Sequence, residues 1–187
     1  WAFASGSFRD LDGYDDADWD EVPNSQFDDW HGKLALGRRW TPEHTTEVQF
    51  LHVDAHEVGI PGKGLALPEG PDVTYPDTRV TLAILSHTIQ PSNGPWVESR
   101  LQMYYELVER LVRIDSFPPP PPGHPLAPVQ VAPEADHTTW GAEWRNIFEL
   151  GDHTVAAGVD GWRWAYEGER TKRYHHLLSD TIVTGVD

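Results

Sequence analysis

Cysteine is absent from this 187-residue chain, so the chain itself can form neither disulfide bonds nor thiolate metal sites. No run of about 18 apolar residues occurs, which excludes a transmembrane helix. Basic residues are few: the chain has 14 Lys and Arg and 30 Asp and Glu, which gives a formal net charge of -16. This surplus disfavours nonspecific attraction to nucleic acid or to an anionic surface, and we expect no nucleic-acid partner.

Motifs of common enzyme classes are also missing. The chain contains no G-x-S-x-G, no Walker sequence and no H-E-x-x-H. We therefore expect no enzymatic activity and no cofactor. The chain starts at Trp1 without a basic-apolar signal segment, and we expect it to be a processed chain or part of a longer one.

Alternation of apolar and polar residues with a period of two recurs along most of the chain and predicts an all-β protein. The clearest run covers 96–113, where Leu101 and Met103 fall on one face and Gln102 on the other. Further strands are predicted at 30–40, 45–52, 78–87, 138–149 and 154–166. In 78–87 the apolar face is Val80, Leu82 and Ile84. In 154–166 the parity shifts, which predicts a bulge near Gly161.

The connections between these strands alternate in length. Short turns at 41–44, 91–95 and 151–153 take turns with long polar segments at about 11–25, 54–76 and 114–135. This alternation predicts an antiparallel up-and-down meander with the short turns at one end and the long loops at the other.

The predicted strands are long, at about 10 to 18 residues, whereas the strands of soluble sandwiches average about five or six. A transmembrane strand needs about 9 to 11 residues and carries aromatic residues at both membrane interfaces. Trp30 and Trp40 at the two ends of one run, and Trp96 and Phe148 beside short turns, fit such girdles. The pattern predicts part of a transmembrane β-barrel, with lipid on one face and a polar lumen on the other. The residues predicted to face the lumen or a plug are Glu98, Arg100, Glu106, Glu143 and Arg145.

Three segments carry a resemblance to a known family: "NSQFDDWHGKLALGRRWTPEHTTEVQF", "GPDVTYPDTRVTLAILSHT" and "GAEWRNIFELGDHTVAAGVDGWRWAYEGERTKRY". Their order resembles the β-barrel of TonB-dependent outer-membrane receptors. In that family a strand like "GKLALGRRW" turns through a tetrapeptide like "TPEH" into the next strand, and "LGDHTVAAGVD" is similar to its recurrent hairpin.

The resemblance implies a barrel of about 22 strands that is plugged by an N-terminal domain and lies in the bacterial outer membrane. Such receptors take up scarce ligands, such as ferric siderophores, haem or cobalamin, with energy from TonB. This chain has no plug, no TonB box and only seven or eight candidate strands, so we expect residues 1–187 to be a single segment of the barrel domain. The implied partners are outer-membrane lipid, the plug, the remaining strands, TonB through the missing part, and a small-molecule or metal-chelate ligand.

Five residues are candidates for ligand capture in extracellular loops: His52, Asp54, His56, Trp162 and Trp164. The first three share one parity, would project about 7 Å apart on a strand, and are residue types that bind Zn²⁺ or Fe. The competing interpretation is that a strand becomes polar where it leaves the membrane. Adjacent His175 and His176 point to opposite faces of a strand, which makes a shared metal there less favourable.

Two other functions fit the same sequence. A secreted all-β carbohydrate- or ligand-binding module would stack sugar rings on Trp140, Trp162 and Trp164. A metal-dependent enzyme would use His52, Asp54 and His56. Retention in membrane vesicles separates the transport hypothesis from both.

Overall fold

The computed structural model describes residues 1–61, 72–115 and 117–187, and in these ranges the chain forms eight β-strands. The strands are β1 (Ala2–Leu11), β2 (Phe27–Arg39), β3 (His44–Gly59), β4 (Asp72–Ile89), β5 (Trp96–Asp115), β6 (Leu126–Leu150), β7 (His153–His176) and β8 (Thr181–Val186). The described residues include no helix of the length and apolarity that crossing a membrane requires.

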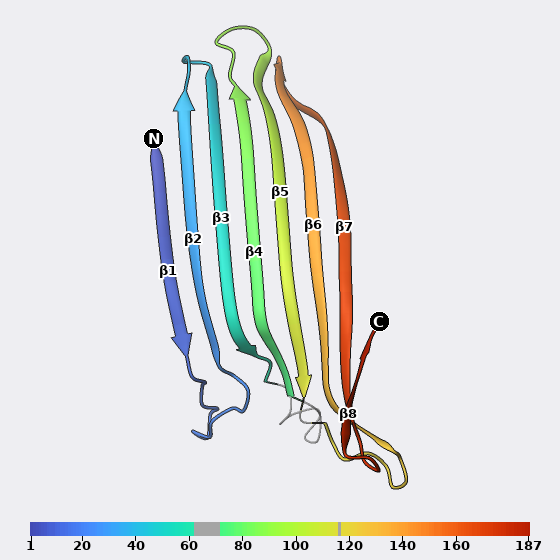
Figure 1. The fold of residues 1–187 in the computed structure, drawn as a ribbon. Coiled ribbons are helices and arrows are strands. Elements are labelled where there is room, and N and C mark those ends of the chain that lie inside the picture. The colour runs from blue at the N-terminus through green and yellow to red at the C-terminus, as the bar shows by residue number, and fades with distance from the viewer. Residues whose placement is uncertain (62–71, 116) are drawn as a thin grey trace.

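The strands form one antiparallel sheet in the order β1-β2-β3-β4-β5-β6-β7-β8, so each pairs only with its neighbours in the chain (Figure 1). The predicted fold, an all-β up-and-down meander, is confirmed. The three predicted short turns lie together at the upper end in Figure 1, and the turn between β7 and β8 lies at the opposite end. We call these the short-turn end and the long-loop end.

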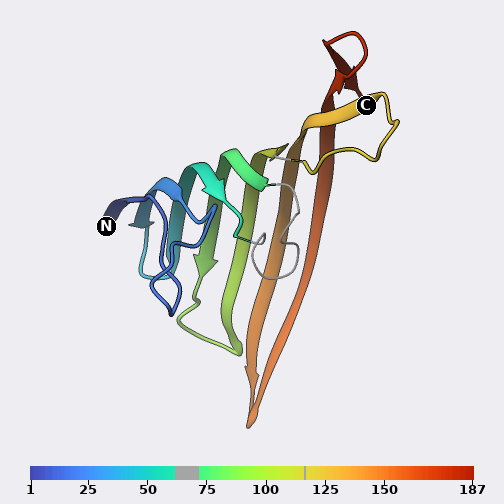
Figure 2. The same ribbon diagram turned by 90° about the horizontal axis from the view of Figure 1, so that it is seen from below.

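The sheet is a single curved layer that does not close on itself (Figure 2). A sandwich would need a second sheet packed against the first, and the described residues provide none. Within the same residues, Ala35 is the one apolar side chain that is buried. The apolar surface of the strands is therefore exposed rather than enclosed in a core.

The register assigns each side chain to one of two faces, because directly paired residues in an antiparallel sheet point to the same side. One row across five strands is Leu34, Phe50, Ala83, Tyr105 and Trp140, and the next is Leu36, Val48, Leu85, Met103 and Ala142. We call this side the apolar-band face. The opposite side, the polar face, carries Lys33, Gln49, Gln102 and Glu143.

The interpretation of β4 from its sequence was wrong. Leu82 pairs with Glu106, and Ile84 pairs with Tyr104, so the run of Val80, Leu82 and Ile84 lies on the polar face. Ala83 and Leu85 lie on the apolar-band face instead. Both faces of β4 are apolar at its centre. The sequence of such a strand therefore does not indicate which of its faces lies on the apolar-band side of the sheet.

The predicted bulge near Gly161 is also wrong. The β6–β7 register runs without interruption past Gly161, and its one irregularity lies between Pro128 and Gln130. Trp162 pairs with Gly141 and Trp164 pairs with Thr139, so both tryptophans lie on the polar face.

Two long connections are shorter than predicted. β3 continues to Gly59 and β6 begins at Leu126, so 54–59 and 126–135 are strand rather than loop. Residues 62–71 of the predicted 54–76 loop lie outside the described residues. β6 includes Pro128 and Pro133, and the first of these stands at the register shift, where a proline is tolerated.

Candidate functional site

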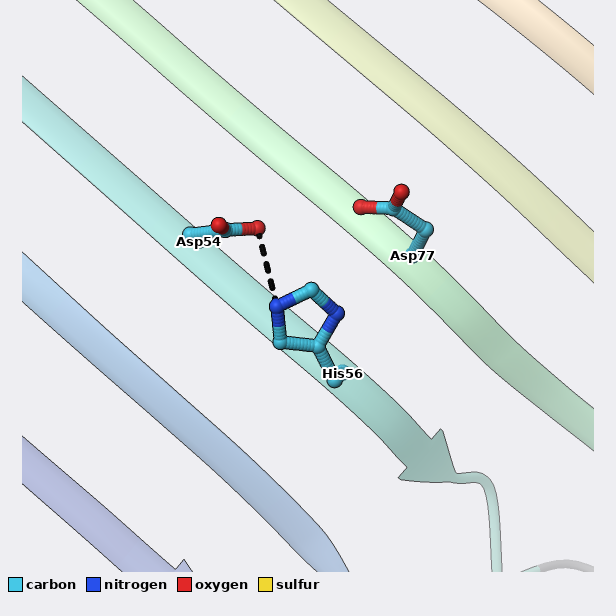
Figure 3. A group of neighbouring side chains, drawn as sticks. All are labelled: Asp54, His56 and Asp77. Carbon is cyan, nitrogen blue, oxygen red and sulfur yellow. Dashed lines mark ion pairs between the residues drawn. The ribbon is translucent and has the colours of Figure 1, made fainter.

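The antiparallel register of β3 and β4 brings three side chains with metal-ligating atoms together on the apolar-band face. His56 pairs directly with Asp77, and Asp54 lies two residues before His56 on the same side of β3. Figure 3 shows Asp77 extending from β4 toward the pair on β3. One oxygen of each carboxylate and one ring nitrogen all lie within 4.8 Å of one another.

The side chains of this cluster are close together, but two of their carboxylate oxygens accept no hydrogen bond. Asp54 Oδ1 lies 3.3 Å from His56 Nε2 and 3.5 Å from Arg79 Nε, and Arg79 Nη2 donates to Asp77 Oδ2 at 2.6 Å. The Asp54 side chain is only 16% exposed. Both Asp54 Oδ1 and Asp77 Oδ1 are buried without a hydrogen-bond partner. Two carboxylates and an imidazole in this arrangement could hold a divalent cation.

His52 does not join this cluster. Its Nδ1 lies 2.9 Å from Thr81 Oγ1, and its ring centroid lies 5.1 Å from that of Trp30. All three predicted ligands His52, Asp54 and His56 lie in strand β3, so their placement in an extracellular loop was wrong. Asp77 was missed because its proximity depends on the β3–β4 register, which alternation within one strand does not reveal.

The five residues predicted to face a lumen or plug share the polar face. Arg100 pairs with Arg145, and the even-numbered positions of β5 and the odd-numbered positions of β6 point to the same side. This side includes Glu98, Arg100, Glu106, Glu143 and Arg145. Arg145 Nη2 lies 3.3 Å from Glu98 Oε1, and Arg100 Nη2 donates to Gln102 Oε1 at 3.1 Å. The ion pair and the hydrogen bond partly satisfy two guanidinium groups that stand opposite each other.

An open concavity of about 480 Å³ borders these charges where β6 meets β7. Its lining includes Tyr104, Glu143, Arg145, Gly158 and Asp160. The lining includes carboxylates, a guanidinium and a phenol, so it offers both hydrogen-bond acceptors and hydrogen-bond donors to a polar ligand.

Trp162 and Trp164 lie in β7, not in a loop as predicted. Trp164 stacks on Tyr166 with ring centroids 6.2 Å apart, and His137 lies 5.7 Å from Trp164 and 4.9 Å from Tyr166. These rings form an aromatic cluster on the polar face. The side chain of Trp162 is 67% exposed and is available for stacking.

An open antiparallel meander whose strands are apolar on one face and polar on the other belongs to the class of sheets that form the walls of up-and-down β-barrels. Among solved structures, the copper transporter OprC has this fold, with a TM-score of 0.76 and 18% sequence identity. The likeness covers 97% of this chain and 26% of the OprC chain, so this chain spans about a quarter of that protein's length. No protein-family model and no curated protein matches the chain.

Proposed function

We propose that this chain is a wall segment of a TonB-dependent receptor in the bacterial outer membrane. The observation that carries the proposal is the continuity of the apolar band across the middle of β2 to β6, behind which the polar face carries charged side chains such as Lys33, Glu106 and Glu143. A lipid-facing surface needs this band, because hydrocarbon cannot solvate charged side chains. The fold shared with a copper transporter supports the proposal.

Aromatic side chains at the margins of the band support the membrane assignment. Trp40 Nε1 donates to Thr46 Oγ1 at 2.9 Å at the short-turn end, while Trp30 lies beside His52 toward the long-loop end. Tryptophan favours the boundary between lipid and water, where its ring is in an apolar environment and its N–H finds a partner.

In this proposal the polar face lines the lumen. Glu98, Arg100, Glu106, Glu143 and Arg145 contact the plug or lumen water and take no part in chemistry. The transported substance is a scarce small molecule or metal chelate, such as a ferric siderophore, haem or cobalamin. Trp162 and Trp164 contact it on its way through the lumen, and TonB acts through parts of the receptor outside this chain.

The membrane assignment is tested by size-exclusion chromatography of the 187-residue polypeptide with and without detergent. The exposed band and the open sheet edges should cause aggregation in plain buffer and a dispersed species in detergent. The polypeptide should also float with lipid vesicles in a density gradient. A sharp monomer peak near 21.1 kDa in plain buffer, with cooperative thermal unfolding, would favour the secreted binding module instead.

The transport assignment needs a test in cells. Removing β3 to β6 from the complete protein should abolish growth on its scarce ligand to the same extent as loss of TonB. Ferric siderophore, haem, cobalamin and copper, each supplied alone under limitation, identify the ligand. Unimpaired growth on all four after the removal would contradict uptake of these ligands.

A further inference from the structure

Toward the long-loop end, the apolar-band face becomes strongly acidic. Two adjacent rows of paired residues beyond the band hold nine carboxylates: Asp10, Asp28, Asp54, Asp77, Glu109, Glu134, Asp136, Glu167 and Glu169. The same rows contain one guanidinium, that of Arg79, and one imidazole, that of His56. Like charges in neighbouring strands repel one another, so this acidic belt favours a bound cation.

Within the belt, one position also offers a nitrogen donor. Zn²⁺ binds imidazole nitrogen and carboxylate oxygen at about 2.0 to 2.2 Å, which places two donors of one tetrahedral ion roughly 3.4 Å apart. His56 Nε2 and Asp54 Oδ1 already lie 3.3 Å apart. The third donor, from Asp77, lies within 4.8 Å of both, a distance that rotation of its side chain can shorten.

The hydrogen-bonding state of the carboxylates points to the same ligand independently of the donor spacing. Asp54 Oδ1 and Asp77 Oδ1 are hidden from solvent, and neither accepts a hydrogen bond. Arg79 donates to the other oxygen of Asp77 and approaches Asp54 without hydrogen-bond geometry. Burying such oxygens without a hydrogen bond is costly, and a cation between them would satisfy both.

We propose that Asp54, His56 and Asp77 form a site for a divalent transition-metal cation of the Zn²⁺ type, which fastens β3 to β4, with water at the remaining position. The mixed nitrogen and oxygen donors favour Zn²⁺ over Ca²⁺ and Mg²⁺, which prefer oxygen alone. The site is on the apolar-band face, so it is separate from the polar face and does not depend on the transport proposal.

The test measures Zn²⁺ binding by equilibrium dialysis, in the buffer or detergent that keeps the complete polypeptide dispersed. The expected result is one tight site that excess Ca²⁺ does not compete for. His56→Asn and Asp77→Asn should each weaken it by about tenfold or more. Zn²⁺ should raise the unfolding temperature of the unmodified chain and leave that of Asp77→Asn unchanged.

Three control variants keep the result interpretable. His87→Asn removes a ring that lies 3.3 Å from His44, and His175→Asn removes a ring that lies 2.6 Å from Asp180, so each breaks a pair outside the proposed site. Arg79→Gln breaks the ion pair with Asp77 but leaves all three donors in place. All three should retain the tight site. Absence of Zn²⁺ binding, its loss in His87→Asn or His175→Asn, or its survival in Asp77→Asn would overturn the proposal.

Discussion

The indole Nε1–H of Trp144 on β6 donates a hydrogen bond of 2.9 Å to the hydroxyl of Ser99 on β5. Ser99 is buried even though it lies on the apolar-band face. Ser99→Ala should lower the free energy of unfolding by about 1 to 3 kcal/mol, because it leaves the indole N–H without a partner. Urea unfolding of the chain reconstituted in vesicles measures this change.

A double-mutant cycle isolates this hydrogen bond. Trp144→Phe removes the donor, so adding Ser99→Ala to Trp144→Phe should cost less than Ser99→Ala alone. Additive effects of the two substitutions would show that the hydrogen bond contributes nothing to stability.

Arginine substitutions test the assignment of the two faces. Leu101→Arg should disfavour folding into lipid vesicles by about 2 to 4 kcal/mol, because it places a charge within the apolar band. Leu34→Arg should behave in the same way. Gln102→Arg lies on the polar face opposite Glu143 and should be tolerated. Equal losses at positions 101 and 102 would contradict the assigned faces.

Gly141 allows a close contact on the polar face. A Cβ there would lie 2.7 Å from the Tyr104 hydroxyl oxygen and 2.8 Å from the Gly161 carbonyl oxygen, and the backbone atom cannot move aside easily. Gly141→Ala should therefore destabilise the β6–β7 hairpin by about 1 to 3 kcal/mol. The matched control is Gly161→Ala, whose Cβ would have no atom within 4 Å. Thermal unfolding of both variants, measured side by side, should shift only for Gly141→Ala.

Glu43, in the turn between β2 and β3, links that turn to the β4–β5 turn. The hydroxyl of Ser92 and its backbone N–H, the latter at 3.0 Å, both donate to Glu43 Oε1 and lower the pKa of this carboxyl below 4.5. Since the pKa is lower in the folded state, the contact stabilises the protein above about pH 4.5 and is lost as the pH falls through the folded-state pKa. In Ser92→Ala, an NMR titration should find the Glu43 midpoint closer to 4.5. An unchanged midpoint would mean that the hydroxyl does not hold the carboxylate.

The overall topology could be predicted from the sequence because strand periodicity and loop lengths are local properties. The run from Trp96 shows this well, since Leu101 and Gln102 are on opposite faces as predicted. β1 and β8 were not predicted, because "AFASGSFRDL" has weak alternation and "TIVTGV" has only six residues. Their strand structure depends on pairing with β2 and β7.

The site was harder to predict because it depends on which strands lie side by side and in which register. His56 and Asp77 are paired across two strands, and nothing in either segment alone specifies that pairing. Likewise, the face of Trp162 follows from its pairing with Gly141, whereas the local pattern of β7 suggested a bulge.

The open edge of β7 should be visible in the hydrogen–deuterium exchange of its backbone amides. Between His153 and Glu169 this strand pairs with β6, and within the described residues no strand lies along its other edge. Every second backbone N–H there points away from β6, so hydrogen–deuterium exchange should alternate between slow and fast along the strand. A neighbouring strand that joined this edge would slow the fast amides and remove the alternation. The exchange pattern of the 17 backbone amides from His153 to Glu169 thus reports whether the wall continues beyond β7.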